Sequence, residues 1–376
     1  MKKGNVIKVL AIVCQMNRCG LESRLMDIIR HNDYERVCID VFSYREQPGI
    51  LDDEIRSFGG TVYYNPPLTV KNMFWYVKYF ENFLKEHEEY KIVHAHQDAW
   101  CSVFCKGAYL AGVPVRIAHS RTAISTLSIN NIVKNIIKFP TRKYATHYFA
   151  VSDLAGEWLF GKKNMRNGKV QIWKNAIDAD KYRFNMEKRT LVRSSLGLKT
   201  EKVIMHVGNF RTGKNQLFLV GLLEAIKKIK NVKLIFVGGA VEQEYLDRVK
   251  REVHERKLEE DILFLGSRDD VPDLLQAADI LCCPSFYEGM PGAVLEAQAS
   301  GLPCVISSGI TKEAIILPTT KVLDLKQSIE IWRNEVLALF DLERRDTYEE
   351  MVKTGFDIHT LITDLTNFYI KIGEMI

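Results

Sequence analysis

The chain has few of the residues that cross-link small secreted domains. Its 376 residues include 8 cysteines, and no two of them form a Cys-x-x-Cys pair. Cys101 and Cys105 are four residues apart, as on one helix face, while Cys282 and Cys283 are adjacent in an apolar run. These spacings favour neither a zinc site nor a disulfide framework. We therefore expect free thiols and a cytoplasmic protein.

Long apolar runs and several ligand motifs are also missing. No apolar run is long enough to span a membrane. The N-terminus begins with basic residues, as a signal peptide does, but Lys8 interrupts its apolar segment, so we expect a buried strand over residues 6–13. There is no Gly-x-Gly-x-x-Gly motif, no Walker motif and no metalloprotease motif, which argues against a dinucleotide redox site. We expect no metal and no cofactor.

Charge is divided unevenly along the chain. Residues 1–180 hold 25 Lys and Arg against 18 Asp and Glu, whereas the remainder holds 27 against 29. A basic first half could face nucleic acid, an anionic membrane surface or a lipid diphosphate. We find no nucleic-acid recognition motif, so we expect no nucleic-acid partner and retain peripheral contact with an anionic membrane.

What is present is a regular alternation of strands and helices over a length that suits two domains. Apolar runs predict strands in the first half at 6–13, 36–42, 60–64, 91–96, 115–120, 147–152 and 170–173, and in the second half at 203–208, 232–237, 262–268, 279–283 and 304–307. Helices are predicted at 21–31, 72–87, 99–111 and 217–229. Strands that alternate with helices at this spacing imply two doubly wound parallel sheets, an α/β fold.

The most informative stretch follows the predicted strand at 279–283. Pro291 can occupy the first turn of the next helix, and Gly301 can close that helix with a left-handed cap. A strand that enters a helix N-terminus through a glycine-containing turn is an anion site. Glu288 and Glu296 flank this turn, and carboxylates accept hydrogen bonds from hydroxyls. A ligand with both phosphates and hydroxyls, such as a nucleotide-sugar, fits this pattern.

Tyr-Glu-Gly-Met-Pro at 287–291, Leu-Glu-Ala at 295–297 and Ser-Gly-Leu-Pro at 300–303 place two glutamates eight residues apart. This pattern resembles the Glu-x7-Glu motif of glycosyltransferase family 4, and the likeness is closest to bacterial exopolysaccharide and capsular polysaccharide transferases. The resemblance implies a GT-B fold, in which two Rossmann-like domains face a cleft. It also implies retention of anomeric configuration and no metal. Asp178-Ala179-Asp180 imitates a metal motif but matches the family's interdomain segment instead.

The resemblance implies a role for each matching residue. Glu288 would act on the sugar and Glu296 on the ribose, while Lys214 and Arg211 would bind the diphosphate. Asn209 stands where the family has arginine, so whether Arg211 compensates stays open. The remaining donor-binding residues implied are Gly20, Gly208, Arg268, Gly289, Met290 and Pro291, and the second catalytic residue is His119. His94 and His96 are expected to be structural or positioning residues.

The expected domains are residues 1–183, completed by a C-terminal helix over 357–376 that crosses back, and residues 184–356. Within the first domain, residues 128–144 form a basic amphipathic stretch that could rest on a membrane or pack on its own domain.

The expected function is transfer of a sugar from a nucleotide-diphosphate donor, preferentially a UDP-sugar, to a glycan or polyprenyl-diphosphate-linked acceptor in bacterial surface polysaccharide synthesis. A GT-B epimerase and a non-catalytic sugar-nucleotide-binding subunit remain as alternatives.

Overall fold

The computed structural model describes residues 6–17, 20–122 and 129–376, with the backbone alone for residues 129–131. Ser128, the first residue of the basic amphipathic stretch 128–144, lies outside these ranges. The chain forms two compact units, residues 1–176 with 357–376 and residues 177–356. The segment 177–183, which the sequence analysis assigned to the first domain, therefore belongs to the second unit, while the C-terminal helix belongs to the first as expected.

The first unit contains a seven-stranded parallel sheet in the order β3-β2-β1-β4-β5-β6-β7. Its strands are β1 (Ile7–Val13), β2 (Val37–Ser43), β3 (Val62–Tyr64), β4 (Ile92–Ala95), β5 (Val115–Ser120), β6 (His147–Ala150) and β7 (Val170–Ile172). Its helices are α1 (Gly20–His31), α2 (Asp52–Ser57), α3 (Met73–Glu86), α4 (Cys101–Leu110), α5 (Ile129–Ile137), α6 (Thr141–Tyr144), α7 (Asp153–Phe160), α8 (Lys162–Arg166) and α17 (Ile358–Gly373). The strands form because their apolar runs are buried on both faces of the sheet.

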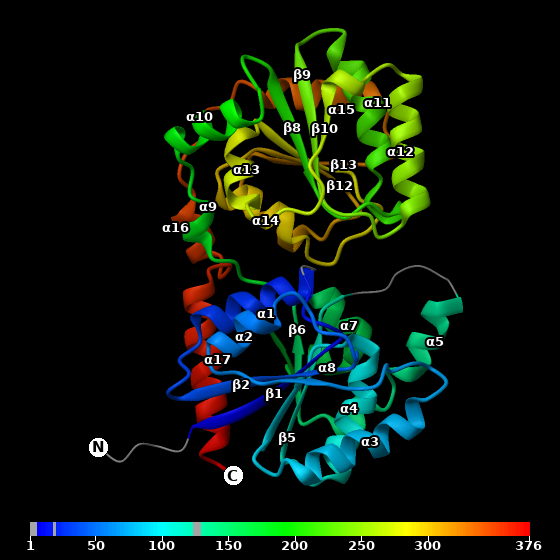
Figure 1. Ribbon diagram of the computed structural model, residues 1–376, viewed down its shortest axis with the longest axis vertical. Helices are drawn as coiled ribbons and strands as arrows, with labels where there is room; N and C mark the ends of the chain where they lie inside the picture. Colours follow the sequence, from blue (N-terminus) through cyan, green and yellow to red (C-terminus); the bar gives the residue numbers. More distant parts are fainter. Residues whose placement is uncertain (1–5, 18–19, 123–128) are drawn as a thin grey trace. The chain divides into compact units, whose positions relative to one another are not determined.

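The C-terminal helix α17 completes the core of the first unit. Its apolar positions recur at helical spacing, and Ile358, Ile362, Leu365 and Tyr369 are buried in one cluster with strand β1 and helix α1. Figure 1 shows α17 (red) beside α1 and the blue strands β1 and β2. Asp357 caps the helix by accepting hydrogen bonds from the N–H groups of His359 and Thr360.

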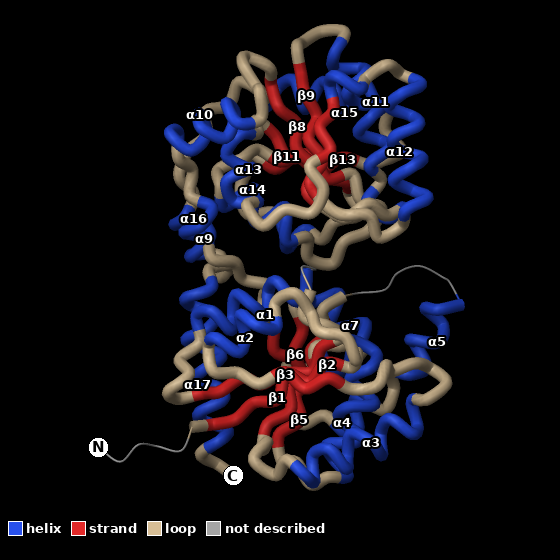
Figure 2. Tube along the Cα trace, viewed as in Figure 1, coloured by secondary structure: helices blue, strands red, loops and turns tan. Residues whose placement is uncertain are grey.

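The second unit contains a six-stranded parallel sheet in the order β10-β9-β8-β11-β12-β13. Its strands are β8 (Lys202–Val207), β9 (Val232–Val237), β10 (Ile262–Phe264), β11 (Ile280–Cys283), β12 (Cys304–Ser307) and β13 (Thr320–Leu323). Its helices are α9 (Ala179–Tyr182), α10 (Met186–Ser195), α11 (Gln216–Lys227), α12 (Gln243–Glu255), α13 (Val271–Ala277), α14 (Gly292–Ala299), α15 (Ile329–Leu339) and α16 (Tyr348–Lys353). Figure 2 shows helices around each sheet, which confirms the predicted α/β architecture.

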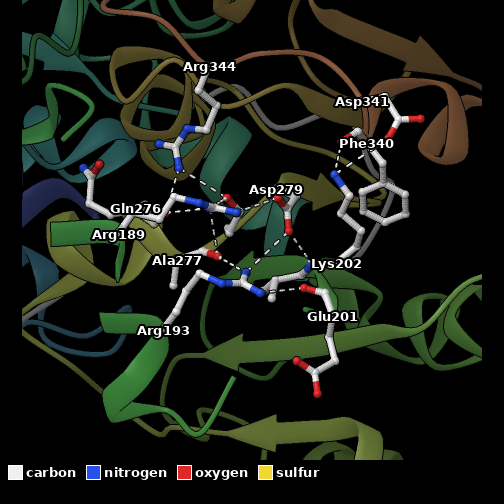
Figure 3. Close-up of polar contacts among 12 residues, drawn as sticks. Arg189, Arg193, Glu201, Lys202, Gln276, Ala277, Asp279, Phe340, Asp341 and Arg344 are labelled. Atoms are coloured by element: carbon white, nitrogen blue, oxygen red, sulfur yellow. Dashed lines mark hydrogen bonds and ion pairs between the residues drawn. The ribbon is translucent and has the colours of Figure 1, made fainter. Parts of the chain in front are cut away.

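Three arginines, Arg189, Arg193 and Arg344, gather at the C-terminal end of helix α13 (Figure 3). Arg344 donates hydrogen bonds to the carbonyl oxygens of Leu275 and Gln276 in the last turn of α13 and of Ala278 just after it. It also donates to the carbonyl oxygen of Ser300 after α14. Carbonyl groups at a helix end lack helical partners and carry the negative end of the dipole, so a guanidinium is well suited there. Burial lowers the pKa of Arg344 to about 9. This contact anchors the helix that carries Glu296.

Candidate functional site

The strand order of the second sheet reverses between β8 and β11. Open parallel sheets bind ligands at such a switch point, outside the carboxyl ends of the strands. Residues 208–214 follow β8, and residues 284–291 follow β11. The topology thus brings most of the predicted donor-binding residues to one edge of one sheet.

An ion pair joins the two loops at this edge. Lys214 Nζ contacts Glu288 Oε1, and the two side chains are 14% and 11% exposed. The hydroxyl of Ser285 donates a second hydrogen bond to the same oxygen at 3.0 Å. Because an unpaired buried charge is costly, each charged group here depends on the other. The pair therefore holds the Glu288 carboxylate in place after β11.

Main-chain contacts shape the loop before α14. The N–H of Phe286 donates to the carbonyl oxygen of Gly213 at 3.0 Å, which connects the loops after β11 and β8. Pro291 is the N-cap residue of α14 and has an extended backbone (φ −75°, ψ 111°). It therefore precedes the helix instead of occupying its first turn. Gly301 (φ 64°) closes α14 as the sequence predicts.

Glu296 is 9% exposed and lies in the second turn of α14. A Cβ atom built at Gly292 would lie 3.6 Å from Glu296 Oε1, because helical side chains lean toward the N-terminus of their helix. Gly289 and Met290, in the turn just before, are buried. The carboxylate of Glu296 and the free N–H groups of the first turn therefore share one end of α14.

Gly208 makes room for the lysine of the ion pair. A Cβ at this position would lie 3.2 Å from His206 Nε2 and 3.5 Å from Lys214 Cδ. His206 Nδ1 donates to the carbonyl oxygen of Cys282 at 2.9 Å, while its Nε2 is buried without a hydrogen-bond partner among the described residues. Burial lowers the pKa of His206 to about 4, and the charge of Lys214 acts in the same direction.

Asn209 replaces the family's arginine and has a structural contact. Its Oδ1 accepts a hydrogen bond from the N–H of Gly239 at 3.0 Å, which joins the turns after β8 and β9. Arg211 is exposed, and within the described ranges its guanidinium makes no hydrogen bond or ion pair. It is thus outside the hydrogen-bonded set formed by Lys214 and Glu288, and its phosphate contact stays a prediction.

Arg268 follows β10 and forms an ion pair with a nearby residue, Asp270. Its Nε donates to Asp270 Oδ1 at 2.8 Å, and its side chain is 42% exposed. A nucleoside base could still stack on the exposed guanidinium plane. Its contact with a base stays a prediction.

In the first unit, His119 lies near the carboxyl end of β5 within a buried cluster. Its Nδ1 is 3.0 Å from His94 Nε2, and His94 Nδ1 is 2.6 Å from the hydroxyl of Tyr369. Burial holds the pKa of both histidines well below the ordinary value, and the charge of Arg121 adds to the effect. Both imidazoles are therefore neutral at pH 7.

The nitrogens of His94, His96 and His119 lie within 4.8 Å of one another, a spacing that could hold a metal ion. However, Arg121 Nη2 lies 2.7 Å from His96 Nδ1, and a guanidinium is a permanent cation that can only donate. Both nitrogens of His94 already have partners. These contacts favour a hydrogen-bonded cluster over a divalent-ion site.

Gly20 begins α1, is exposed, and has no heavy atom within 4 Å of a Cβ built on it. Steric crowding in the described structure does not require glycine here, and its proximity to donor phosphates stays a prediction.

Sequence reasoning missed Ser285, Arg121, His206 and Tyr369. Ser285 and Arg121 had a usable signal, because each lies within two residues of the end of a predicted strand. His206 and Tyr369 had none, because their partners lie far away in the sequence.

Two family comparisons cover most of the chain. Residues 19–181 match the family described as Glycosyltransferase Family 4, and residues 188–352 match Glycosyl transferases group 1.

The relatives include three bacterial glycosyltransferases with matches over two thirds or more of this chain. The glycosyltransferase named EpsF of Bacillus subtilis is 30% identical over 371 residues, which is 96% of each chain. The capsular polysaccharide biosynthesis glycosyltransferase CapH of Staphylococcus aureus is 26% identical over 97% of this chain and 99% of its own. An Escherichia coli UDP-Gal:α-D-GlcNAc-diphosphoundecaprenol α-1,3-galactosyltransferase is 30% identical over 69% of this chain and 67% of its own.

A solved structure agrees with this chain over nearly its whole length. The crystal structure of Anabaena HepE in complex with UDP-glucose superimposes with a TM-score of 0.78 and 19% identity, and covers 96% of this chain and 98% of HepE. At this identity the likeness establishes the fold alone.

Proposed function

This chain belongs to glycosyltransferase family 4 and is a glycosyltransferase, and we propose that it transfers a hexosyl or N-acetylhexosaminyl group from a UDP-sugar with retention and without a metal ion. The acceptor is a glycan or a polyprenyl-diphosphate-linked sugar of bacterial surface polysaccharide synthesis. The relatives support this choice, because CapH serves capsule synthesis and the E. coli transferase uses UDP-Gal and a diphosphoundecaprenol-linked acceptor.

One observation carries the donor site. Lys214 and Glu288 form a largely buried ion pair at the switch point of the second sheet, and the carboxylate of Glu296 lies near Gly292 at the N-terminal end of α14. A cation, free helix N–H groups and two carboxylates suit a ligand that has both a diphosphate and hydroxyl groups.

Each group has a proposed task. The ammonium of Lys214 has three donors, so it can bind the diphosphate and still contact Glu288. The N–H groups of Gly289 and Met290 add donors, whereas the nitrogen of Pro291 cannot donate. Such groups stabilise the charge that develops on the leaving diphosphate, which is the task a metal ion performs elsewhere.

The carboxylates bind the neutral part of the donor. Glu288 positions sugar hydroxyls and stabilises the positive anomeric centre, while Glu296 accepts hydrogen bonds from the ribose hydroxyls. Arg268 stacks on the base, and His119 contacts the reacting sugar. The proposed donor contacts near the phosphates also include Gly20 at the start of α1, Gly208 after β8 and Arg211 in the loop that follows Gly208.

Membrane contact is a second part of the proposal. In and after α5, Ile132, Ile136 and Phe139 are exposed at 52%, 66% and 61%, and Lys134 is exposed on the same helix. An apolar stripe with basic neighbours suits the surface of an anionic membrane. Within the described residues no helix is long and apolar enough to cross a membrane. Ile136→Glu should sediment with phosphatidylglycerol vesicles less than the wild type does. With phosphatidylcholine vesicles, the control, the substitution should leave sedimentation unchanged.

A thermal-shift screen across UDP-, GDP- and ADP-sugars tests the donor proposal. A ligand at 100 times its dissociation constant stabilises the folded protein by about 2.7 kcal/mol. We expect stabilisation by a UDP-sugar and the same response after treatment with EDTA. Stabilisation only after a divalent ion is added would contradict metal independence.

Product analysis separates the alternatives. Incubation of the donor without acceptor should leave the sugar configuration unchanged, whereas a GT-B epimerase would convert it. Binding without transfer to any polyprenyl-diphosphate-linked or glycan acceptor would support a non-catalytic subunit.

A further inference from the structure

A chain of hydrogen bonds in the first unit ends at His119. The hydroxyl of Tyr369 lies 2.6 Å from His94 Nδ1, and His94 Nε2 lies 3.0 Å from His119 Nδ1. These contacts join helix α17 to strands β4 and β5. The three residues are only 3%, 1% and 4% exposed, so bulk water does not compete for their hydrogen bonds.

The direction of these bonds follows from the donors available. A neutral imidazole has one N–H and one acceptor nitrogen. If Tyr369 accepted from His94, its own hydroxyl hydrogen would need another acceptor, and the described residues give that oxygen no second hydrogen bond. Leaving a buried donor unpaired costs about 1–3 kcal/mol. The favoured order therefore runs from the Tyr369 hydroxyl to His94 Nδ1, and from the His94 Nε2–H to His119 Nδ1.

This order leaves a hydrogen-bond donor at the end of the chain. With its Nδ1 accepting, His119 carries its proton on Nε2, and this atom is buried without a partner among the described residues. Arg121 Nε is a second donor that is buried without a hydrogen-bond partner among the described residues. Both residues line a cavity of about 10 Å³ together with Lys174, which is room for about one water oxygen. These two donors suit one acceptor oxygen, whereas the rest of the lining is mostly apolar and comes from Ile28, Phe149, Trp173, Leu361 and Leu365.

We propose that Tyr369 and His94 are positioning residues that hold His119 in its Nε2–H tautomer, so that His119 donates a hydrogen bond to one oxygen of the sugar substrate and does not act as a general base. The contact with substrate rests on the proposed function, whereas the tautomer does not. Burial and the neighbouring cation Arg121 keep the pKa of His94 and His119 low. Both imidazoles are therefore neutral at pH 7.

Tyr369→Phe tests this chain of hydrogen bonds, called the relay below, because the substitution removes the hydroxyl and keeps the ring. Tyr76→Phe is the matched control, because Tyr76 is also buried in this unit and its hydroxyl donates elsewhere, to the carbonyl oxygen of Pro66 at 2.9 Å. The tautomers are read by long-range 1H–15N NMR of protein labelled in histidine. We expect a single Nε2–H form of His119 in the wild type and in Tyr76→Phe, and a mixture of tautomers in Tyr369→Phe.

His94→Gln provides a second variant in case Tyr369→Phe does not fold. The glutamine amide can donate to His119 Nδ1 from near the former Nε2 position, so the Nε2–H form should be retained. An Nδ1–H form of His119 in the wild type would overturn the proposal. So would a tautomer unchanged by Tyr369→Phe.

Turnover supplies a readout that a merely structural role would not affect. Release of UDP from UDP-glucose is the probe, and Tyr369→Phe should lower kcat about threefold to tenfold, the value of one neutral hydrogen bond. The KM for the donor should change less than kcat, and the pH profile should be flat between about 6 and 8. If His119 has the expected tautomer but His119→Gln retains full turnover, the substrate contact is wrong while the relay stands.

Discussion

Lys214 and Glu288 should stabilise the second unit as a coupled pair, so the effects of replacing each residue alone should not add up to the effect of replacing both. In Lys214→Met, the Glu288 carboxylate keeps only the Ser285 hydroxyl at a position where its side chain is 11% exposed. Breaking a buried pair costs about 3–5 kcal/mol. We expect about 3 kcal/mol, because both side chains keep some contact with water.

Replacing the other partner of the ion pair should destabilise the second unit less. Glu288→Gln keeps an oxygen that accepts from Lys214, so the expected loss is about 1 kcal/mol. The double variant leaves no unpaired charge, and a coupling energy of about 2 kcal/mol should result.

Hydrogen exchange of peptides that contain β8 and β11 is a suitable assay, because it reports on the unfolding of the second unit alone. Urea dependence of the exchange gives the free energy of unfolding for the four proteins of the cycle. A coupling below about 0.5 kcal/mol would refute the reasoning and make the ion pair incidental.

Three further results are expected. Glu288→Ala should lower kcat more than it weakens donor binding, because its task lies at the anomeric centre; wild-type turnover in this variant would exclude that task. His206 binds a proton only near pH 4 when folded but near pH 6.5 when unfolded, so the free energy of unfolding should fall as pH decreases from about 6.5 to 4, and less steeply in His206→Asn. Arg344→Lys should cost about 2–3 kcal/mol in thermal unfolding, because lysine cannot reach the carbonyls of both helices; Arg345→Lys, whose side chain is 60% exposed, is the control and should change stability by under 0.5 kcal/mol.

The strands of both sheets were largely predictable from the sequence, because their apolar runs are buried in parallel sheets and bounded by turn residues. Strand β13 was missed, because no strand is predicted after 304–307. Thr320–Leu323 lies at the sheet edge, where Lys321 and Val322 are exposed, so its sequence lacks the continuous apolar run of a central strand.

In the candidate site, residues in local motifs were predictable, whereas contacts between distant residues were not. Lys214, Glu288 and Glu296 were recognisable because each lies in a local motif. The contact between Lys214 and Glu288 was not, because it joins two loops that meet only at the switch point of the sheet. Asn209 likewise became interpretable only from its hydrogen bond to Gly239.

The central claim is that the second unit binds a nucleotide-sugar through groups at the N-terminal end of α14. Calorimetric titration of wild type and Glu296→Gln with UDP tests it most directly, with exposed Glu343→Gln as the control. Loss of a charged acceptor for the ribose hydroxyls should raise the dissociation constant roughly tenfold to hundredfold, or about 1–3 kcal/mol. An equal affinity for UDP in all three proteins would contradict the account.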